Sequence, residues 1–153
     1  MEMQSIEREL YIEASPEIVF DVVSSPEHVK NWWPDEADYE PAPGSAGKIV
    51  FGDPASGGAV VGFVVVDVVP PRTFSFRWTQ PVGETAVEGS SLLVTFDLTP
   101  AGDGTLLKMT ETGFREMGWE AAVLEQQYRE HATGWDFFLP RLAPYAATLD
   151  VRR

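Results

Sequence analysis

Hydrophobic and polar positions follow three successive patterns along the chain. Residues 6–13 place Ile6, Leu10 and Ile12 on one face, which predicts a first β-strand. The tripeptide Ser-Pro-Glu then starts at Ser15 and again at Ser25. Each copy combines an N-cap residue, a proline at the first helical position and an acidic first turn. We therefore expect two short helices after the first strand, with the second ending at Trp-Trp-Pro.

Between residues 48 and 113 the apolar side chains recur at every second position. Such alternation predicts antiparallel strands with one buried face and one solvated face. The inner face should carry Phe74, Phe76, Trp78, Leu92, Val94, Phe96, Leu107 and Met109. Residues 60–69 are apolar on both faces. We expect other elements or a second subunit to cover that strand.

The last third of the chain has a helical period. Apolar side chains recur there at intervals of three and four residues, which places them on one stripe of a long helix. The stripe consists of Leu124, Tyr128, His131, Trp135, Phe138 and Leu142. From Trp119 to Leu142 such a helix would be about 35 Å long. Pro140 should kink or break it, because proline clashes with the carbonyl four residues before it.

These patterns together predict an α+β fold. An antiparallel sheet of about six or seven strands must bury one apolar face, and the long C-terminal helix is the element left to cover it. The chain has 153 residues, of which 44% are hydrophobic and 12% aromatic. This length and composition predict a single domain over residues 1–153 with a well-packed core.

The composition excludes several classes of function. With 11 Lys and Arg against 24 Asp and Glu, the formal charge is −13, which argues against nucleic acid or an anionic membrane as a partner. The absence of cysteine excludes disulfides and thiol catalysis. The two histidines lie far apart and the acidic residues lack ligand spacing, so we expect neither a metal nor a cofactor. Without a secretion signal or a membrane-spanning run, we expect a soluble cytoplasmic protein.

Three stretches resemble the family named after the activator of heat-shock protein 90 ATPase, within the START-like and polyketide-cyclase superfamily. They are Ala14–Trp33 with both Ser-Pro-Glu signals, Val69–Trp78, and Glu111–Phe114 together with His131–Trp135. The stretches occur in the family's order and span nearly the whole chain. The resemblance implies a helix-grip fold, in which a curved antiparallel sheet wraps around a C-terminal helix.

The resemblance also implies an elongated cavity between the sheet and the helix, lined by apolar and aromatic groups. The inward strand positions and the helix stripe converge on the same place, which suits a small hydrophobic ligand. The alternative is that these aromatic side chains simply fill a core. We expect the ligand site to comprise Trp32, Trp33, Phe51, Phe63, Phe76, Trp78, Phe96, Met109, Glu111, His131, Trp135 and Phe138.

Two polar residues interrupt the apolar surfaces. Glu111 shares the strand parity of Met109, so its side chain should point inward, and His131 lies on the helix stripe. A buried carboxylate needs a partner, a water or a ligand. The two groups could form a polar end of the cavity, act as acid and base in an enzyme, or be a structural histidine and a solvated rim carboxylate.

The remaining expectations concern tryptophan and glycine. One of Trp32 and Trp33 should plug an end of the cavity, and the other should pack on the surface or at a dimer contact. Gly134 should let the helix approach the sheet closely, with Trp135 filling the gap beside it.

Three functions follow from these observations. The first is a binding protein for a small hydrophobic or aromatic ligand. The second is a cyclase, aromatase or hydrolase that uses the same cavity. The third is regulation of a chaperone ATPase by protein contact, which is less favoured because the eukaryotic activator carries an additional N-terminal domain. A homodimer is compatible with each.

Overall fold

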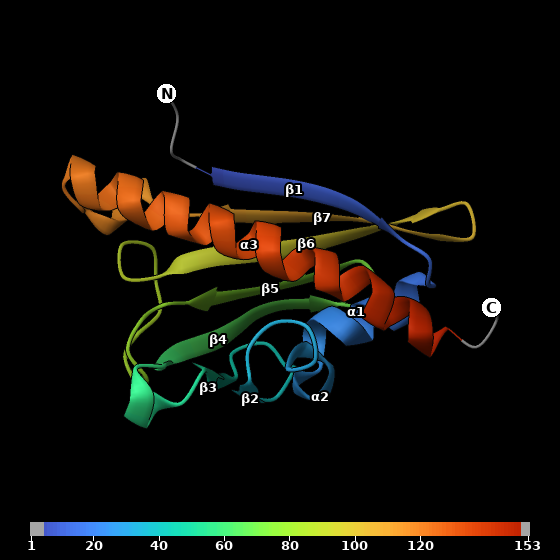
Figure 1. Cartoon of the computed structure of the whole chain (residues 1–153), viewed down its shortest axis with the longest axis horizontal. Coiled ribbons are helices and arrows are strands. Elements are labelled where there is room, and N and C mark those ends of the chain that lie inside the picture. The colour runs from blue at the N-terminus through green and yellow to red at the C-terminus, as the bar shows by residue number, and fades with distance from the viewer. Residues whose placement is uncertain (1–4, 151–153) are drawn as a thin grey trace.

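The computed structural model describes residues 5–150 and contains a seven-stranded antiparallel sheet. Its strands are β1 (Ser5–Ile12), β2 (Glu36–Asp38), β3 (Ala46–Phe51), β4 (Ala59–Val69), β5 (Thr73–Trp78), β6 (Leu92–Ala101) and β7 (Gly104–Thr112). Strands β2 to β7 follow one another across the sheet, and β1 closes the far edge beside β7 (Figure 1). The predicted helix-grip arrangement of a curved antiparallel sheet and a C-terminal helix is confirmed.

Two short helices connect the edge strands β1 and β2. Helix α1 (Pro16–Ser24) begins where predicted, because the Ser15 side chain accepts a hydrogen bond from the backbone N–H of Ile18. Helix α2 (Pro26–Val29) follows directly and is shorter than predicted. Turns continue from its end and carry the chain through Trp33, whose N–H donates to the Val29 carbonyl at 3.0 Å. Two 3₁₀ turns, Pro54–Ser56 and Arg115–Met117, complete the elements.

Helix α3 (Ala121–Leu149) runs diagonally across the inner face of the sheet (Figure 1). It lies closest to β1 and α1. Arg8 of β1 donates to Asp136 of α3 at 2.7 Å, and the Tyr128 hydroxyl donates to the Ser5 carbonyl at 2.8 Å. No helix within residues 5–150 is long and apolar enough to cross a membrane.

Of the predicted kink or break at Pro140, the break is wrong, because α3 continues through both Pro140 and Pro144. Four residues separate these prolines, so they lie on the same face of the helix, and both are exposed. The carbonyls that lose their N–H partners can therefore be hydrated. On the opposite side Leu139, Leu142 and Ala146 are buried, and their packing holds the helix together.

The sequence predicts that other elements or a second subunit cover β4. Its apolar outward side chains are not covered by another element of the described chain, so the first alternative is wrong and the second stays a prediction. Val60 is 44% exposed, Val66 36% and Val69 52%. The strand is nevertheless paired on both sides, with β3 and β5, so only the side chains of its outer face meet solvent.

Tyr39 joins the loop after β2 to the core. Its hydroxyl donates to the Ser24 carbonyl at 2.8 Å, and its ring stacks on Phe63 with centroids 4.4 Å apart. Burial raises the pKa of the Tyr39 hydroxyl, because the phenolate would lose its hydration. The folded chain therefore keeps this proton at pH values where the unfolded chain releases it.

We predict that Tyr39→Phe lowers the free energy of unfolding by about 1 kcal/mol at neutral pH, because one buried hydrogen bond is lost. In the unchanged protein, stability should fall as the pH rises above about 10, where the tyrosine of the unfolded chain ionises. Tyr39→Phe should show a shallower fall. Urea unfolding at about pH 8 and about pH 11 measures both effects.

Tyr11 provides the control, because its side chain is 49% exposed. In Tyr11→Phe, the free energy of unfolding should fall at alkaline pH as much as it does in the unchanged protein. An equal fall in Tyr39→Phe would contradict the assignment of this pH dependence to Tyr39.

Candidate functional site

A small apolar pocket opens along the flank of α3 that faces away from β1. Its volume is about 110 Å³. The side chains come from the turn after α2, the ends of β3 and β5, and three turns of α3. They are Trp33, Phe51, Trp78, Glu130, His131, Gly134, Trp135 and Phe138.

Trp33 is the central ring of this pocket. Its ring centroid lies 5.1 Å from that of Trp135 in a stacked arrangement and 4.9 Å from that of Trp78 in an edge arrangement. Phe51 approaches it edge-on at 5.8 Å. Aromatic pairs at such distances add stability beyond the area that they bury. The pocket wall is therefore a set of mutually supported rings.

A fully buried carboxylate lies behind the rings. Glu111 of β7 is 0% exposed. The indole N–H of Trp78 donates to its Oε2 at 2.7 Å, and the indole N–H of Trp135 donates to its Oε1 at 2.8 Å. Nδ1 of His131 lies 3.0 Å from both oxygens. Three donors from β5 and α3 thus compensate the carboxylate for its lost hydration.

His131 connects this carboxylate to the pocket. An ionised carboxylate only accepts hydrogen bonds, so Nδ1 carries the proton and donates it to Glu111. The ring contacts Trp78 at 5.2 Å and Phe114 at 5.5 Å between centroids. Nε2 has no hydrogen-bond partner among the residues that the structure describes, and the ring lines the pocket. This arrangement leaves one polar imidazole edge available to a ligand.

A shallow groove continues outward from the pocket along α3. Its volume is about 480 Å³, and it shares Glu130, Gly134 and Phe138 with the pocket. Phe137 borders the groove and is 61% exposed. The guanidinium of Arg141 lies 5.7 Å from the ring centroids of Phe137 and Phe138. An apolar surface therefore extends from the buried rings to solvent.

The predicted site residues separate into three groups. Six of them line the pocket: Trp33, Phe51, Trp78, His131, Trp135 and Phe138. Glu111 lies behind the pocket and accepts hydrogen bonds from three of those six side chains, namely Trp78, His131 and Trp135. The other five do not line this pocket and are packed in the core, namely Trp32, Phe63, Phe76, Phe96 and Met109.

The two adjacent tryptophans thus have different roles from those expected. Trp33 borders the cavity, as one of the two was predicted to do. Trp32 is 0% exposed, and its indole N–H donates to the Val22 carbonyl at 2.9 Å. The expectation that the second tryptophan packs on the surface or at a dimer contact is therefore wrong, because Trp32 is already buried within the single chain.

Sequence reasoning missed Glu130 and Gly134 as pocket residues. It assigned Gly134 to close packing against the sheet, which is wrong, because a Cβ built there would meet no atom within 4 Å. A glycine inside a helix costs about 0.5–1 kcal/mol relative to alanine. An unexplained helix glycine beside a buried His and Trp was the signal that could have identified it.

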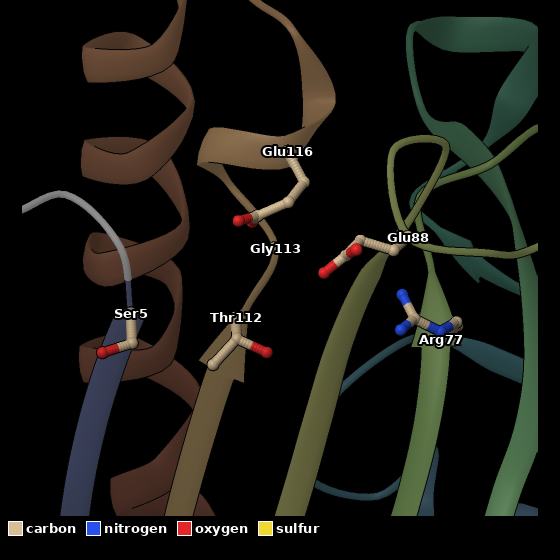
Figure 2. A pocket seen from close by; sticks show the side chains of 6 residues that line it. All are labelled: Ser5, Arg77, Glu88, Thr112, Gly113 and Glu116. Carbon is tan, nitrogen blue, oxygen red and sulfur yellow. The ribbon is translucent and has the colours of Figure 1, made fainter.

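A second, polar pocket of about 310 Å³ lies at the ends of β5, β6 and β7. The carboxylates of Glu88 and Glu116 point into it above Thr112 (Figure 2). Both of these side chains are exposed, and the half-buried Arg77 adds a cation to the lining. Within residues 5–150, no group of three or more His, Asp or Glu side chains could hold a metal ion.

Comparison with known proteins identifies one matching family. The family model described as activator of Hsp90 ATPase homolog 1-like protein matches residues 13–147. No curated protein matches the chain.

Several solved structures share the fold. Protein MLL2253 from Mesorhizobium loti has a TM-score of 0.73 at 23% identity, over 96% of this chain and 99% of that one. The Aha1 dimer from Colwellia psychrerythraea has a TM-score of 0.68 at 21% identity, over 91% and 92%. DynU16, a protein in the dynemicin biosynthetic locus, has a TM-score of 0.71 at 23% identity, over 98% of this chain and 49% of its own.

We predict that Glu111→Gln destabilises the protein by about 1–3 kcal/mol. The amide has one oxygen and one NH₂ group, so in either orientation an N–H of Trp78 or Trp135 faces another donor. Denaturant unfolding measures the change. Glu116→Gln is the control, because that side chain is exposed and its change should have no measurable effect. Equal stability of Glu111→Gln and the unchanged protein would contradict the three-donor network.

Proposed function

The chain belongs to the activator of Hsp90 ATPase homolog 1-like family, and from this premise we propose that it binds a small hydrophobic or aromatic molecule in the pocket beside α3. The observation that carries the proposal is the pocket wall of indole and phenyl rings with a single oriented imidazole. Apolar linings with a few placed polar groups are typical of small-molecule sites.

The size of the pocket limits what can enter it. A volume of about 110 Å³ is below the roughly 300–1,000 Å³ of sites that enclose a whole drug-sized ligand. An engineered apolar cavity of roughly 150 Å³ takes one benzene ring. One ring of the ligand therefore enters the pocket against the stacked rings of Trp33 and Trp135, and any further part lies along the groove over Phe137 and Phe138.

An enzymatic role is the alternative, and the Glu111–His131 pair favours it. A carboxylate that orients an imidazole through Nδ1 leaves Nε2 to accept and return a proton. Both Glu111 oxygens are already occupied by the indole donors, so proton transfer would rest on His131. Such a site would suit the ring closure of a cyclase or aromatase, or a hydrolysis reaction.

Two protein partners remain expectations. Self-association is supported by the exposed valines of β4 and by the dimeric structural neighbour from Colwellia psychrerythraea. Contact with a chaperone is supported by the family description alone.

The proposed site predicts a specific response to toluene, which has the size of one ring. Titration should give saturable shifts of the indole N–H resonances of Trp33, Trp78 and Trp135. The remaining two of the five tryptophans are internal controls, because neither Trp32 nor Trp119 lines the pocket. Two-dimensional ¹⁵N NMR measures all five together. Equal or non-saturable shifts of all five signals would place toluene elsewhere.

We also predict opposite effects of Gly134→Ala on stability and on binding. Removing a helix glycine should stabilise the protein by about 0.5–1 kcal/mol, since the new methyl meets no atom within 4 Å. That methyl extends into the pocket, so toluene affinity should fall. Thermal unfolding and the same NMR titration measure the two effects.

Thr148→Ala is the control for this prediction. It also raises helix propensity on the exposed surface of α3, far from the pocket. It should leave toluene binding unchanged. Unaltered toluene affinity in Gly134→Ala would remove this position from the mouth of the pocket.

A further inference from the structure

We propose that the pocket selects aromatic alcohols, with the ligand hydroxyl donating a hydrogen bond to Nε2 of His131. This inference rests on the proposed function and names its ligand class. Glu111 acts here as a positioning residue, since it reaches the ligand only through the imidazole.

The first step of the argument is the direction of the imidazole. Nδ1 is held by both oxygens of Glu111 at 3.0 Å. With Nδ1 protonated, Nε2 of the neutral ring is a hydrogen-bond acceptor. The imidazole ring cannot easily turn, because it packs between Trp78 and Phe114. Its centroid lies 5.2 Å from that of Trp78 and 5.5 Å from that of Phe114. In its neutral form the imidazole therefore gives the pocket an acceptor in a fixed position.

The second step concerns the orientation of Glu111 itself. An isolated carboxylate could rotate and let the imidazole move with it. Here the indole N–H groups of Trp78 and Trp135 hold one oxygen each, at 2.7 and 2.8 Å. The donors on β5 and α3 thus fix the carboxylate, and the carboxylate fixes the imidazole.

The third step is the charge that a ligand meets. Glu111 lies behind the imidazole, and Glu130 lines the pocket. The formal charge of the whole chain is −13. The guanidinium of Arg141 lies over Phe137 and Phe138. At the imidazole, next to Glu111, a carboxylate or phosphate group is disfavoured and a neutral group that donates a hydrogen bond is favoured.

The fourth step identifies that group as a hydroxyl on a ring. The indole nitrogen of Trp33 also has no hydrogen-bond partner in the described part of the chain, and its ring lines the pocket. A hydroxyl both donates and accepts, so it suits an unpartnered acceptor and an unpartnered donor. The pocket wall consists mainly of the rings of Trp33, Phe51, Trp78, Trp135 and Phe138, and its volume is about 110 Å³, so the rest of the ligand should be apolar and no larger than one ring.

The experiment compares three ligands that differ in this group only. Toluene has no polar atom, 4-methylanisole has an acceptor only, and p-cresol has a donor and an acceptor. In the unchanged protein we expect p-cresol to bind roughly 3–10-fold more tightly than 4-methylanisole, the range given by one hydrogen bond. Calorimetry measures the three dissociation constants.

His131→Phe removes the acceptor and keeps an aromatic ring, so the preference for p-cresol over 4-methylanisole should disappear. Glu111→Gln should reduce the same ratio, because the imidazole loses its fixed orientation. If Glu111 has a purely structural role, Glu111→Gln should weaken the binding of p-cresol and of 4-methylanisole equally. The ratio of their dissociation constants would then be unchanged.

A measurement on the unchanged protein covers the case in which a variant does not fold. The ¹⁵N resonance of His131 Nε2 should shift on addition of p-cresol and not on addition of toluene. If toluene binds as tightly as p-cresol and this resonance does not move, the preference for aromatic alcohols is wrong. The proposal that the pocket binds a small aromatic molecule is then still supported. If none of the three ligands binds, the proposed function and the ligand class both fail.

Discussion

The structure depends on the hydrogen bonds around the buried carboxylate of Glu111. An ionised carboxylate removed from water is unfavourable by several kcal/mol unless donors replace its hydration. Here the donors are Trp78 on β5 and His131 and Trp135 on α3. Because these groups must converge on one point, they set the register of α3 against the sheet. The same convergence brings the rings of Trp78 and Trp135 to the pocket that Trp33 completes.

The aromatic packing determines the size of the pocket. The core between α1, the sheet and α3 is filled by Phe63, Phe76 and Phe96, each close to fully buried. A ring-sized pocket lies at the flank of α3 that faces away from β1, and another hollow of about 270 Å³ lies at the flank beside β1. The first pocket continues into a surface groove. The rings that line it are direct neighbours of the rings that fill the core.

Helix α3 combines three residues that are unfavourable for a helix. Gly134 lines the pocket, whereas Pro140 and Pro144 are exposed to solvent. Helices of this kind are held by tertiary packing more than by local propensity. The buried side chains of Trp135 and Leu142 supply that packing. The glycine then keeps the pocket open, and the prolines leave their unpaired carbonyls to water.

The apolar faces could be predicted from the order of residues, because strand and helix periods assign each residue a side. The same periods placed Glu111 inward and His131 on the buried stripe, and local motifs identified the strands, the N-cap at Ser15 and the family. Which rings border a cavity and which fill the core depends on the packing of distant segments, since a period gives a direction and not a depth. The tertiary structure also reversed the interpretation of Gly134, because the space around a missing side chain depends on segments distant in sequence.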